Sequence, residues 1–449
     1  MNKRQFLKNS GGLVAGTLLS QLAPASLAAA AEAPRTNWAG NLHYHAKELY
    51  TPATVAELQE TVKKLTSLRA LGSRHSFNTI ADSVTNQIST AKLDSMEFDA
   101  AAKTVTVGAG VRYGTLAPWL DAKGFAVHNL ASLPHITVAG AIATATHGSG
   151  VRNGNLATAV AGLEIVTASG ELLKLTRKDP AFAGAVVGLG ALGVVSKVTL
   201  DVQPRFEMKQ LVYQNLPMSE LEHNLETIMG SGYSVSLFTT WKNRNIDEVW
   251  LKSKVAPGEA NNIPPLFYNA KAATQNLHPI AGISAVNCTD QMGVAGPWYE
   301  RMPHFKMNFT PSSGAELQTE YFVPRNRGYE AIMAVESLHE KISPHLLITE
   351  LRSIAADELW MSMAYQRDSL AIHFTWKPET PQVMALLPQI EEKLAPFQAR
   401  PHWAKLFTTS PAKLKTLYPK MADFQALLKE HDPQGKFRNE FVNHNVFGA

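Results

Sequence analysis

The sequence contains a single cysteine, Cys288, among its 449 residues. One thiol cannot form an intramolecular disulfide, and it cannot supply the clustered ligands of a cysteine-based metal site. The surrounding segment, AVNCTDQMG, contains no evident partner for Cys288. We therefore expect a small buried side chain rather than a reactive thiol.

Charged residues are also scarce, and neither sign dominates. Asp, Glu, Lys and Arg make up 18% of the chain, and the formal net charge is +4. The sequence has no dense Lys/Arg run and no basic stripe, which argues against nucleic acid as a partner. Hydrophobic residues amount to 45%, which indicates a globular protein, and the length allows two or three domains.

Long hydrophobic runs are missing as well, because no segment after the first thirty residues reaches the ~20 apolar residues of a membrane-spanning helix. Residues 1–31 instead resemble a secretory signal, with basic Lys3, Arg4 and Lys8 before an apolar stretch and small residues. KRQFLK is similar to the twin-arginine export signal, with Lys3 replacing the first arginine; an ordinary secretion signal is the alternative. We expect an exported protein, periplasmic or secreted, without a stable membrane anchor.

The rest of the chain alternates between helical and extended patterns. Apolar spacing predicts helices over residues 54–67, 113–122, 219–229 and 327–342, and one more after Pro419. Strands are predicted over residues 68–71, 104–107, 193–202, 346–354 and 370–376, with a hairpin in residues 162–176. After Pro204 the sequence pattern changes to long helical stretches that alternate with strands rich in aromatic residues. The whole pattern predicts a mixed α+β fold with a domain boundary near residue 205.

The first motif with chemical potential is LGSRHSFN, residues 71–78, which follows a predicted strand. Small residues and side-chain hydroxyls dominate it. Such a turn can present successive backbone N–H groups to a pyrophosphate, although it is neither a P-loop nor a GxGxxG fingerprint. Taken alone, the motif is weak evidence, and His75 fits a structural histidine better.

The second motif is ASLPHITVAGAIATATHGSG, residues 131–150. Small side chains occupy most positions after Pro134, whereas a packed core favours larger ones. A segment of this kind lets the backbone approach a flat ligand or a phosphate closely. A tightly packed small-residue segment is the alternative interpretation.

A third constellation lies on two predicted strands. Glu350 and Arg352 are two residues apart, as are His373 and Thr375, so each pair points to one face of its strand. Two polar faces among apolar neighbours indicate the floor of a polar pocket. The alternative is a surface sheet with a Glu–Arg pair, which contributes at most ~1 kcal/mol when it is exposed.

The two small-residue motifs together resemble the vanillyl-alcohol-oxidase-type flavoprotein family. The likeness is narrower to the alditol oxidases, relatives of the sugar-lactone oxidases, and it extends from about residue 36 to the C-terminus. The matching segments are TNWAGN (36–41), ALGSRHSFN (70–78), ASLPHITVAG (131–140), VGLGALGVV (187–195), TPSSGAELQTEY (310–321) and PHWAK (401–405). The resemblance implies an α+β fold with a two-part FAD-binding domain and an α+β substrate, or cap, domain with an antiparallel sheet.

The resemblance also implies domain limits and a cofactor site. After the signal at residues 1–31, an FAD-binding domain is expected over 32–205 and a substrate-binding domain over 206–400. The C-terminal segment 401–449 is expected to contribute to the active site and return to the FAD domain. His75 occupies the position that often bonds covalently to the flavin, so covalent FAD is expected. Further FAD contacts are expected from Leu71, Gly72, Ser73, Arg74, Ser76, Phe77, Ser132, Thr137, Gly140, Ala143, Thr144 and His147, and from Val195 at the adenine end.

By the same resemblance, the substrate is a sugar alcohol such as xylitol, sorbitol or glycerol. Its terminal primary alcohol is oxidised to the aldose, and oxygen is reduced to hydrogen peroxide. Arg352 and Lys405 are expected to favour the alkoxide, while His373 accepts the proton or only orients Glu350. The expected substrate-binding groups are Ser132, Glu350, Arg352, Thr375 and Lys405. The enzyme is expected to be a monomer without a metal.

Two other functions stay open from the sequence. A sugar-1,4-lactone oxidase or dehydrogenase of the same superfamily shares the Glu-x-Arg pair and the HW-x-K motif. A secreted carbohydrate-binding protein would keep the fold without catalysis, and the intact set of His75, Glu350, Arg352, His373 and Lys405 argues against it. The preferred polyol and the natural electron acceptor also stay open.

Overall fold

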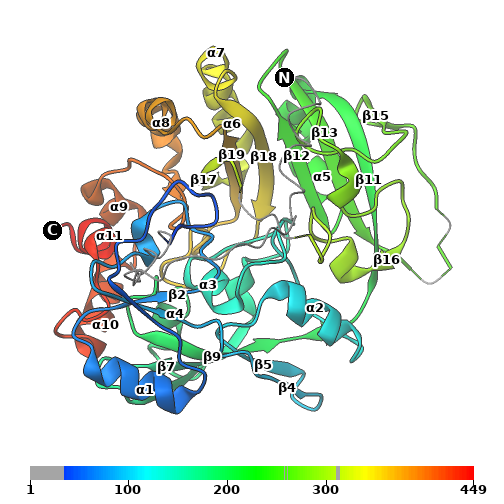
Figure 1. Cartoon of the computed structure of the whole chain (residues 1–449). Coiled ribbons are helices and arrows are strands. Elements are labelled where there is room, and N and C mark those ends of the chain that lie inside the picture. Colours follow the sequence, from blue (N-terminus) through cyan, green and yellow to red (C-terminus); the bar gives the residue numbers. More distant parts are fainter. Residues whose placement is uncertain (1–34, 257, 260, 310–313) are drawn as a thin grey trace, which may run out of the picture. The chain divides into compact units, whose positions relative to one another are not determined.

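The computed structural model describes residues 35–256, 258–259, 261–309 and 314–449. The expected signal at residues 1–31 and the first four residues of the TPSSGAELQTEY segment lie outside the described residues. Figure 1 shows a large sheet above and smaller sheets below, with β2 and α3 close to the level where they meet.

The N-terminal part forms a three-stranded parallel sheet in the order β1-β3-β2. Its strands are β1 (Glu48–Tyr50), β2 (Arg69–Leu71) and β3 (Asn86–Ser89). Helix α1 (Val55–Lys64) begins after Thr54, whose side chain accepts a hydrogen bond from the Glu57 N–H, as expected for a helix N-cap. Its apolar spacing buries Leu58 and Val62, so both the predicted helix and the predicted strand after it are confirmed.

A five-stranded antiparallel sheet follows in the order β4-β5-β9-β7-β8. Its strands are β4 (Met96–Asp99), β5 (Thr104–Gly108), β7 (Val160–Val166), β8 (Leu172–Thr176) and β9 (Val194–Asp201). The predicted hairpin is the β7–β8 pair, and Gly170 adopts φ +81° in its turn, a conformation that glycine reaches at low cost. The helices of this part are α2 (Tyr113–Asp121), α3 (Val138–Ala143) and α4 (Phe182–Val186).

The remaining strands form a ten-stranded sheet in the order β14-β15-β11-β13-β12-β18-β19-β17-β20, with β16 beside β11. The long strands are β11 (Glu207–Pro217), β12 (Ser234–Thr239), β13 (Asn245–Lys254), β17 (Leu317–Pro324), β18 (Leu346–Ile354) and β19 (Ser369–Trp376). The short ones are β14 (Leu266–Phe267), β15 (Ala270–Ala272), β16 (Gly296–Pro297) and β20 (Arg400–Pro401), while β6 (Phe125–Ala126) and β10 (Gln203–Pro204) pair separately. The pairs in this sheet are antiparallel, which confirms the sheet type predicted for the substrate domain.

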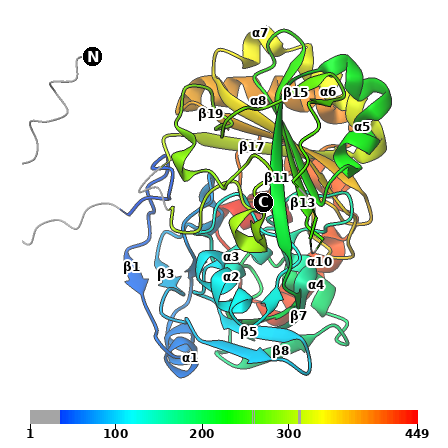
Figure 2. The ribbon, with the colours of Figure 1, turned by 90° about the vertical axis from the view of Figure 1, so that its right-hand side faces the viewer.

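Helices cover one face of the large sheet (Figure 2). They are α5 (Leu221–Gly230), α6 (Gly328–Glu336), α7 (His339–Ile342) and α8 (Thr380–Leu394). Leu351, Ile372 and Phe374 belong to the same core cluster as the apolar residues of these helices. Since side chains alternate along a strand, Glu350 and His373 point to the opposite face, which is free to line a site.

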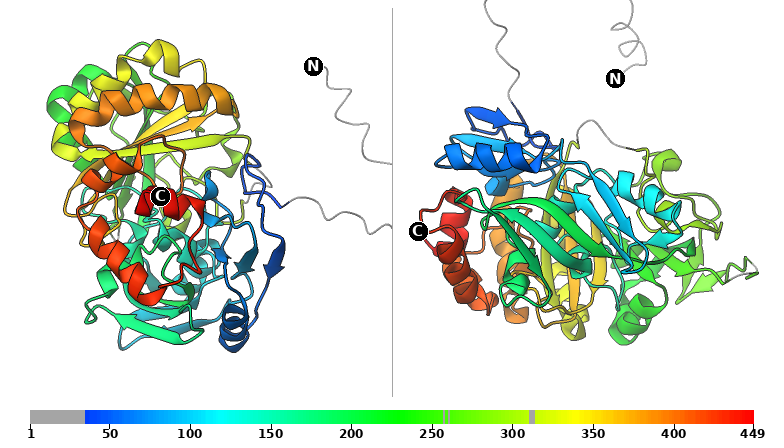
Figure 3. Two further views of the ribbon diagram at one scale, coloured as in Figure 1. Left: turned by 90° about the vertical axis from the view of Figure 1, so that its left-hand side faces the viewer. Right: turned by 90° about the horizontal axis from the view of Figure 1, so that it is seen from below.

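The C-terminal segment packs beside the smaller sheets (Figure 3). Its helices are α9 (Pro411–Leu417), α10 (Met421–His431) and α11 (Glu440–Val442). The Lys436 carbonyl accepts a hydrogen bond from the Leu68 N–H, and the Lys436 ammonium donates to the Val62 and Ala168 carbonyls. Lys436 therefore ties the C-terminal segment to α1, to the residue before β2 and to the β7–β8 turn.

Most predicted elements are present, with one interruption. The helix predicted over residues 327–342 is divided into α6 and α7, because the Leu338 N–H bonds the Val335 carbonyl three residues back and tightens the turn. Short helical turns complete the fold at η1 (Thr79–Ala81), η2 (Leu156–Ala159), η3 (Met218–Glu220), η4 (Ala285–Asn287), η5 (Trp298–Glu300), η6 (Arg325–Arg327), η7 (Ala395–Phe397) and η8 (Asn443–Phe447). Cys288 is buried with a free thiol, as predicted, and burial raises its pKa to about 12. The domain limits near residues 205 and 400 stay predictions.

Candidate active site

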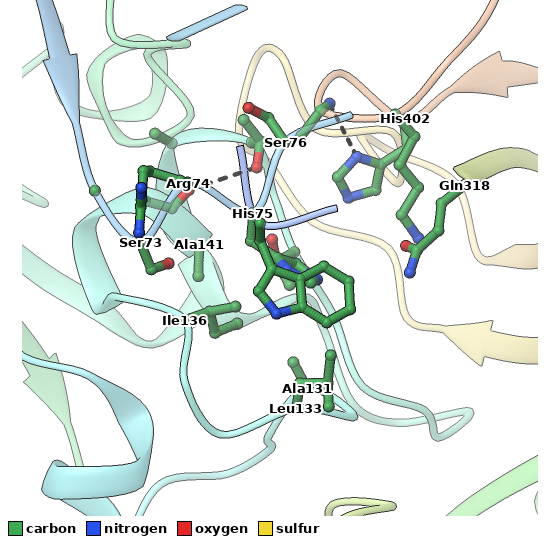
Figure 4. Close-up of a pocket in the computed structure, with 18 of the residues that line it drawn as sticks. Ser73, Arg74, His75, Ser76, Ala131, Leu133, Ile136, Ala141, Gln318 and His402 are labelled. Atoms are coloured by element: carbon green, nitrogen blue, oxygen red, sulfur yellow. Dashed lines mark hydrogen bonds between the residues drawn. The ribbon is translucent and has the colours of Figure 1, made fainter. Parts of the chain in front are cut away.

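A cavity of about 530 Å³ is lined both by loops of the smaller sheets and by strands of the ten-stranded sheet. The first set comes from the loop after β2, from residues 131–147 and from residues 185–195. The second comes from β17, β18 and β19 and from residues 402–405. Figure 4 shows residues 73–76 on one side of this space, with Gln318 and His402 across from them.

The loop after β2 presents backbone donors. None of the N–H groups of residues 72–76 donates a hydrogen bond to another described residue, and these residues line the cavity. Arg74 has φ +63°, so the loop combines left-handed and ordinary backbone. Successive N–H groups in such a turn form a concavity that binds anions.

The second motif packs closely against this loop. Thr137 is the N-cap of α3: its hydroxyl accepts a hydrogen bond from the Gly140 N–H at 3.3 Å. The Thr137 N–H in turn donates to the Ser73 hydroxyl at 3.2 Å. A Cβ at Gly72 would lie 2.6 Å from the Thr137 hydroxyl oxygen, so a side chain there would force the two segments apart.

A buried arginine holds a third segment of the wall. The Arg69 guanidinium donates to the carbonyls of Ile80, Leu189, Gly190 and Phe437 at 2.5–2.8 Å. No carboxylate of the described chain pairs with it, and burial lowers its pKa to about 10. Arg69 thus fixes the loop at residues 189–190 and places a positive charge beside the cavity.

His75 lies in an aromatic cluster at the cavity wall. Its ring centroid is 4.5 Å from that of Trp38, and its Nδ1 is 3.3 Å from His135 Nε2. Burial, with smaller effects from His135 and Lys405, lowers the pKa of His75 well below its ordinary value. The imidazole is therefore neutral near pH 7 and carries a nucleophilic lone pair.

Glu320 on β17 is the hub of the polar floor. Its fully buried carboxylate accepts hydrogen bonds from Lys405 Nζ at 2.7 Å, His147 Nε2 at 3.1 Å and Arg352 Nη2 at 3.2 Å. Burial opposes the charge of Glu320, but Lys405 and His147 outweigh it and hold the Glu320 pKa well below its ordinary value. One anion thereby fixes two cations side by side.

Glu350 and Arg352 lie together on β18, as predicted. Arg352 Nε is 3.5 Å from Glu350 Oε1, and Arg352 Nη1 lies 3.4 Å from the Ser132 hydroxyl. Glu350 Oε1 is also 2.8 Å from His304 Nε2. Burial disfavours the charge of Glu350, but Arg352 and His304 outweigh it and lower its pKa.

His373 faces Glu350 across the sheet register, but its side-chain partners are different. Its Nδ1 is 2.7 Å from Lys405 Nζ, and its Nε2 is 3.1 Å from the Thr375 hydroxyl. An ammonium can only donate, so Nδ1 accepts from Lys405 and Nε2 carries the hydrogen. Burial lowers the pKa of His373 to about 4.

The comparisons with known proteins agree with this geometry. A family model described as FAD binding domain matches residues 46–176, and one described as D-arabinono-1,4-lactone oxidase matches residues 311–445. An alditol oxidase of Streptomyces sp. is 47% identical over 412 residues, which cover 91% of this chain and 97% of that protein. The chain belongs to the alditol oxidase family.

Other proteins share sequence or fold with this alditol oxidase family member at lower identity. An L-gulono-1,4-lactone dehydrogenase of Mycobacterium tuberculosis is 28% identical over 91% of this chain and 97% of its own. A cholesterol oxidase from B. sterolicum has the same fold, with a TM-score of 0.76 at 14% identity over 92% of this chain and 96% of that one. The chain is an FAD-dependent oxidoreductase with the predicted fold class.

The residues of this alditol oxidase family member fit FAD. The unpaired N–H groups of residues 72–76 suit the two phosphates, whose negative charge the Arg69 guanidinium also favours. A Cβ at Gly72 would collide with the Thr137 hydroxyl, so the backbone of the first motif lies directly against the second. Both motifs that the sequence singled out therefore meet at one wall of the cavity.

Almost all predicted site residues line this cavity. They are Leu71, Gly72, Ser73, Arg74, His75, Ser76, Ser132, Gly140, Ala143, Thr144, His147, Val195, Glu350, Arg352, His373, Thr375 and Lys405. Phe77 and Thr137 are not among the lining residues. Phe77 packs on Trp38 and His75, and its N–H bonds the Ala404 carbonyl, so both residues support the wall from behind.

Sequence reasoning missed several groups of the site. Glu320 and His402 lay inside quoted segments of the resemblance, yet neither was singled out. Gln318 and Glu320 alternate with Leu317 and Thr319 on β17, and this polar alternation was the available signal. No signal in the sequence pointed to His304, because this residue lies in a loop between distant strands.

The described part of the chain contains no helix that is both long and apolar enough to cross a membrane. It also contains no group of three or more His, Cys, Asp or Glu side chains placed to hold a metal ion.

Proposed function

We propose that the protein oxidises the terminal primary alcohol of a sugar alcohol, such as xylitol, sorbitol or glycerol, to the aldose and reduces oxygen to hydrogen peroxide. The alditol oxidase relative at 47% identity supports the reaction class. The observation that carries the proposal is the pair of cations, buried Arg352 and partly buried Lys405, that Glu320 holds side by side at the cavity.

These cations suit the chemistry of alcohol oxidation. Bound FAD would supply the acceptor for the hydride of the carbinol carbon. Arg352 and Lys405 stabilise the negative charge that develops on the alcohol oxygen as its proton leaves, and low solvent exposure strengthens this effect. The positive charges are preorganised, because Glu320 and His373 already hold the Lys405 ammonium at 2.7 Å.

The contacts of His373 favour an orienting role over proton acceptance. Both ring nitrogens are engaged, by Lys405 and by Thr375, and a pKa of about 4 makes the neutral imidazole a weak base. We propose that His373 aligns Lys405 and the Thr375 hydroxyl. Glu350 depends on His304 instead.

Hydroxyl recognition along the polyol falls to the other polar groups of the cavity. Glu350 accepts hydrogen bonds, while the hydroxyls of Ser132 and Thr375 can donate or accept. A substrate that lacks a hydroxyl leaves one of these groups unpaired, which disfavours its binding. We therefore expect discrimination among linear polyols according to hydroxyl position.

The rates with polyols and lactones test the substrate class. We expect hydrogen peroxide from xylitol or sorbitol at a kcat/KM well above that for a sugar 1,4-lactone. Two observations keep the lactone oxidase alternative: the family model over residues 311–445 and the L-gulono-1,4-lactone dehydrogenase relative at 28% identity. A higher kcat/KM for the lactone would replace our proposal with that alternative.

We also propose that FAD is bound covalently through His75. The neutral imidazole at the cavity wall and its contact with His135 support this assignment. After acid precipitation, we expect yellow flavin to remain in the pellet of the wild type and to enter the supernatant for His75→Ala. The control is His128→Ala, at a histidine that does not line the cavity. Flavin in the wild-type supernatant would overturn the covalent assignment.

Export is proposed from the first residues alone. The basic residues, apolar stretch and small-residue sites of residues 1–31 are typical of a signal peptide. Fractionation of cells that express the full chain tests this, with Lys3→Gln/Arg4→Gln as the variant. We expect mature enzyme outside the cytoplasm for the wild type and cytoplasmic precursor for the variant; equal distributions would contradict a twin-arginine signal.

A further inference from the structure

A fully buried lysine outside the proposed catalytic pair lies behind the site. Lys252 on β13 donates from Nζ to the Met302 and Pro303 carbonyls, each at 2.7 Å, and lies 3.3 Å from His304 Nδ1. No carboxylate lies within ion-pair distance of this ammonium in the described chain. The hydrogen-bond partners of the Lys252 ammonium thus all lie in residues 302–304.

The contact with Lys252 decides which nitrogen of His304 carries hydrogen. An ammonium has three N–H donors and no lone pair, so Nδ1 of His304 must accept. The single hydrogen of the neutral imidazole is then on Nε2, which donates to Glu350 Oε1 at 2.8 Å. Burial lowers the pKa of Lys252 to about 7 and that of His304 to about 4, which agrees with an ammonium and a neutral ring at about pH 6.

The position of Glu350 follows from this arrangement. Oε1 takes the contacts with His304 and with Arg352 Nε. Oε2 accepts no hydrogen bond from the described residues, and Glu350 lines the cavity. A carboxylate oxygen held in this way accepts hydrogen bonds and cannot donate them.

We propose that Lys252 and His304 are positioning residues that lock the Glu350 carboxylate, so that its Oε2 binds a substrate hydroxyl remote from the reacting carbon. The inference rests on the proposed polyol oxidation. The same segment also reaches the flavin side, because the N–H groups of His304 and Phe305 bond the Ser132 carbonyl at 3.3 and 3.4 Å. Lys252 therefore supports two proposed substrate-binding residues, Glu350 and Ser132, through the loop at residues 302–305.

The hydrogen-bond relay is tested without any turnover. The holoenzyme is labelled with ¹⁵N-histidine, and the His304 ring signals are identified by their loss in His304→Gln. At about pH 6 we expect the Nε2–H form for His304 in the wild type and a changed ring pattern in Lys252→Met. An Nδ1–H ring or an imidazolium in the wild type would overturn the relay.

Steady-state kinetics test the role in substrate binding. His304→Ala should raise the KM for xylitol about tenfold with a much smaller change in kcat. His304→Gln, which keeps an N–H donor, should recover part of the loss. Glu350→Gln combined with His304→Ala should raise KM little beyond Glu350→Gln alone, because both changes remove the same interaction.

The control for the loss of an imidazole as such is His128→Ala. The His128 ring bonds the Gly154 carbonyl and does not line the cavity. Equal KM changes for His128→Ala and His304→Ala, or additive effects with Glu350→Gln, would overturn the positioning role. A wild-type enzyme that oxidises no polyol would instead overturn the proposed function, and the ¹⁵N measurement would still decide the relay.

Discussion

Glu320→Gln is the substitution that probes the centre of the site most directly. The amide keeps the shape of the side chain and removes its charge. In the native protein this charge, with no solvent exposure, is shared by Lys405, Arg352 and His147. The variant leaves buried Arg352 and partly buried Lys405 without their common anion. Removing one partner of a buried ion pair is strongly destabilising, because the other charge stays behind without compensation.

The expected loss of stability is large for a single isosteric change. Removing one partner of a buried pair costs about 3–5 kcal/mol, and the amide oxygen of Gln still accepts one hydrogen bond. We therefore expect about 3 kcal/mol in the free energy of unfolding, measured by urea titration. The kcat/KM for xylitol should fall about 100-fold, because Lys405 and Arg352 lose their alignment.

The pH profile carries the sharper test. Burial lowers the pKa of Lys405, and Glu320 opposes this by raising it. Without Glu320 the Lys405 pKa falls further, so the ammonium is lost at a lower pH. The alkaline limb of kcat/KM, measured between about pH 6 and 10, should move to lower pH in Glu320→Gln.

The matched control is Glu391→Gln. Glu391 accepts hydrogen bonds from the hydroxyls of Tyr321 and Thr408 and pairs with no cation in the part of the chain that is described. This variant should lose about 1 kcal/mol or less and keep the wild-type alkaline limb. If Glu320→Gln matches the control in both stability and pH profile, the idea of an anionic hub is wrong.

Further substitutions test other parts of the site. Gly72→Ala places a Cβ 2.6 Å from the Thr137 hydroxyl and should lower the flavin content, which absorbance measures. The control is Gly230→Ala, whose Cβ would have its nearest neighbour at 3.9 Å and which should keep the flavin content of the wild type. Equal flavin contents in the two variants would contradict the argument that Gly72 must lie close to Thr137. Arg69→Met removes four hydrogen bonds and should lower both the urea midpoint and the flavin content, and a normal flavin content would show that the loop needs no such anchor. Thr375→Val should raise the KM for xylitol about tenfold at nearly constant kcat, and an unchanged KM would remove Thr375 from the substrate site.

Local sequence was sufficient for most elements near the site. The two-residue spacing of Glu350 and Arg352 placed both on one face of a strand, and the structure confirms that they share the cavity. The same holds for His373 and Thr375 on β19. Period-two alternation is set by the backbone itself, so it can be predicted without a tertiary structure.

The partners of these residues could not be predicted in the same way. His373 was expected either to accept a proton or to orient Glu350, and the structure instead pairs it with Lys405 and Thr375. Glu350 is held by His304, which lies 46 residues away in the sequence. Such contacts depend on how strands and loops from separate segments meet in space. The spacing of residues along the sequence does not reveal this.

By itself, the sequence determined the α+β class, the two small-residue motifs and the polar strand faces, because backbone periodicity and turn chemistry act over a few residues. Only the tertiary structure decided that Glu320 holds Lys405 and Arg352 together and that Lys252 reaches Glu350 through His304. A buried charge is tolerated only where partners from distant segments converge on it. That convergence is a property of the folded chain and not of any one segment.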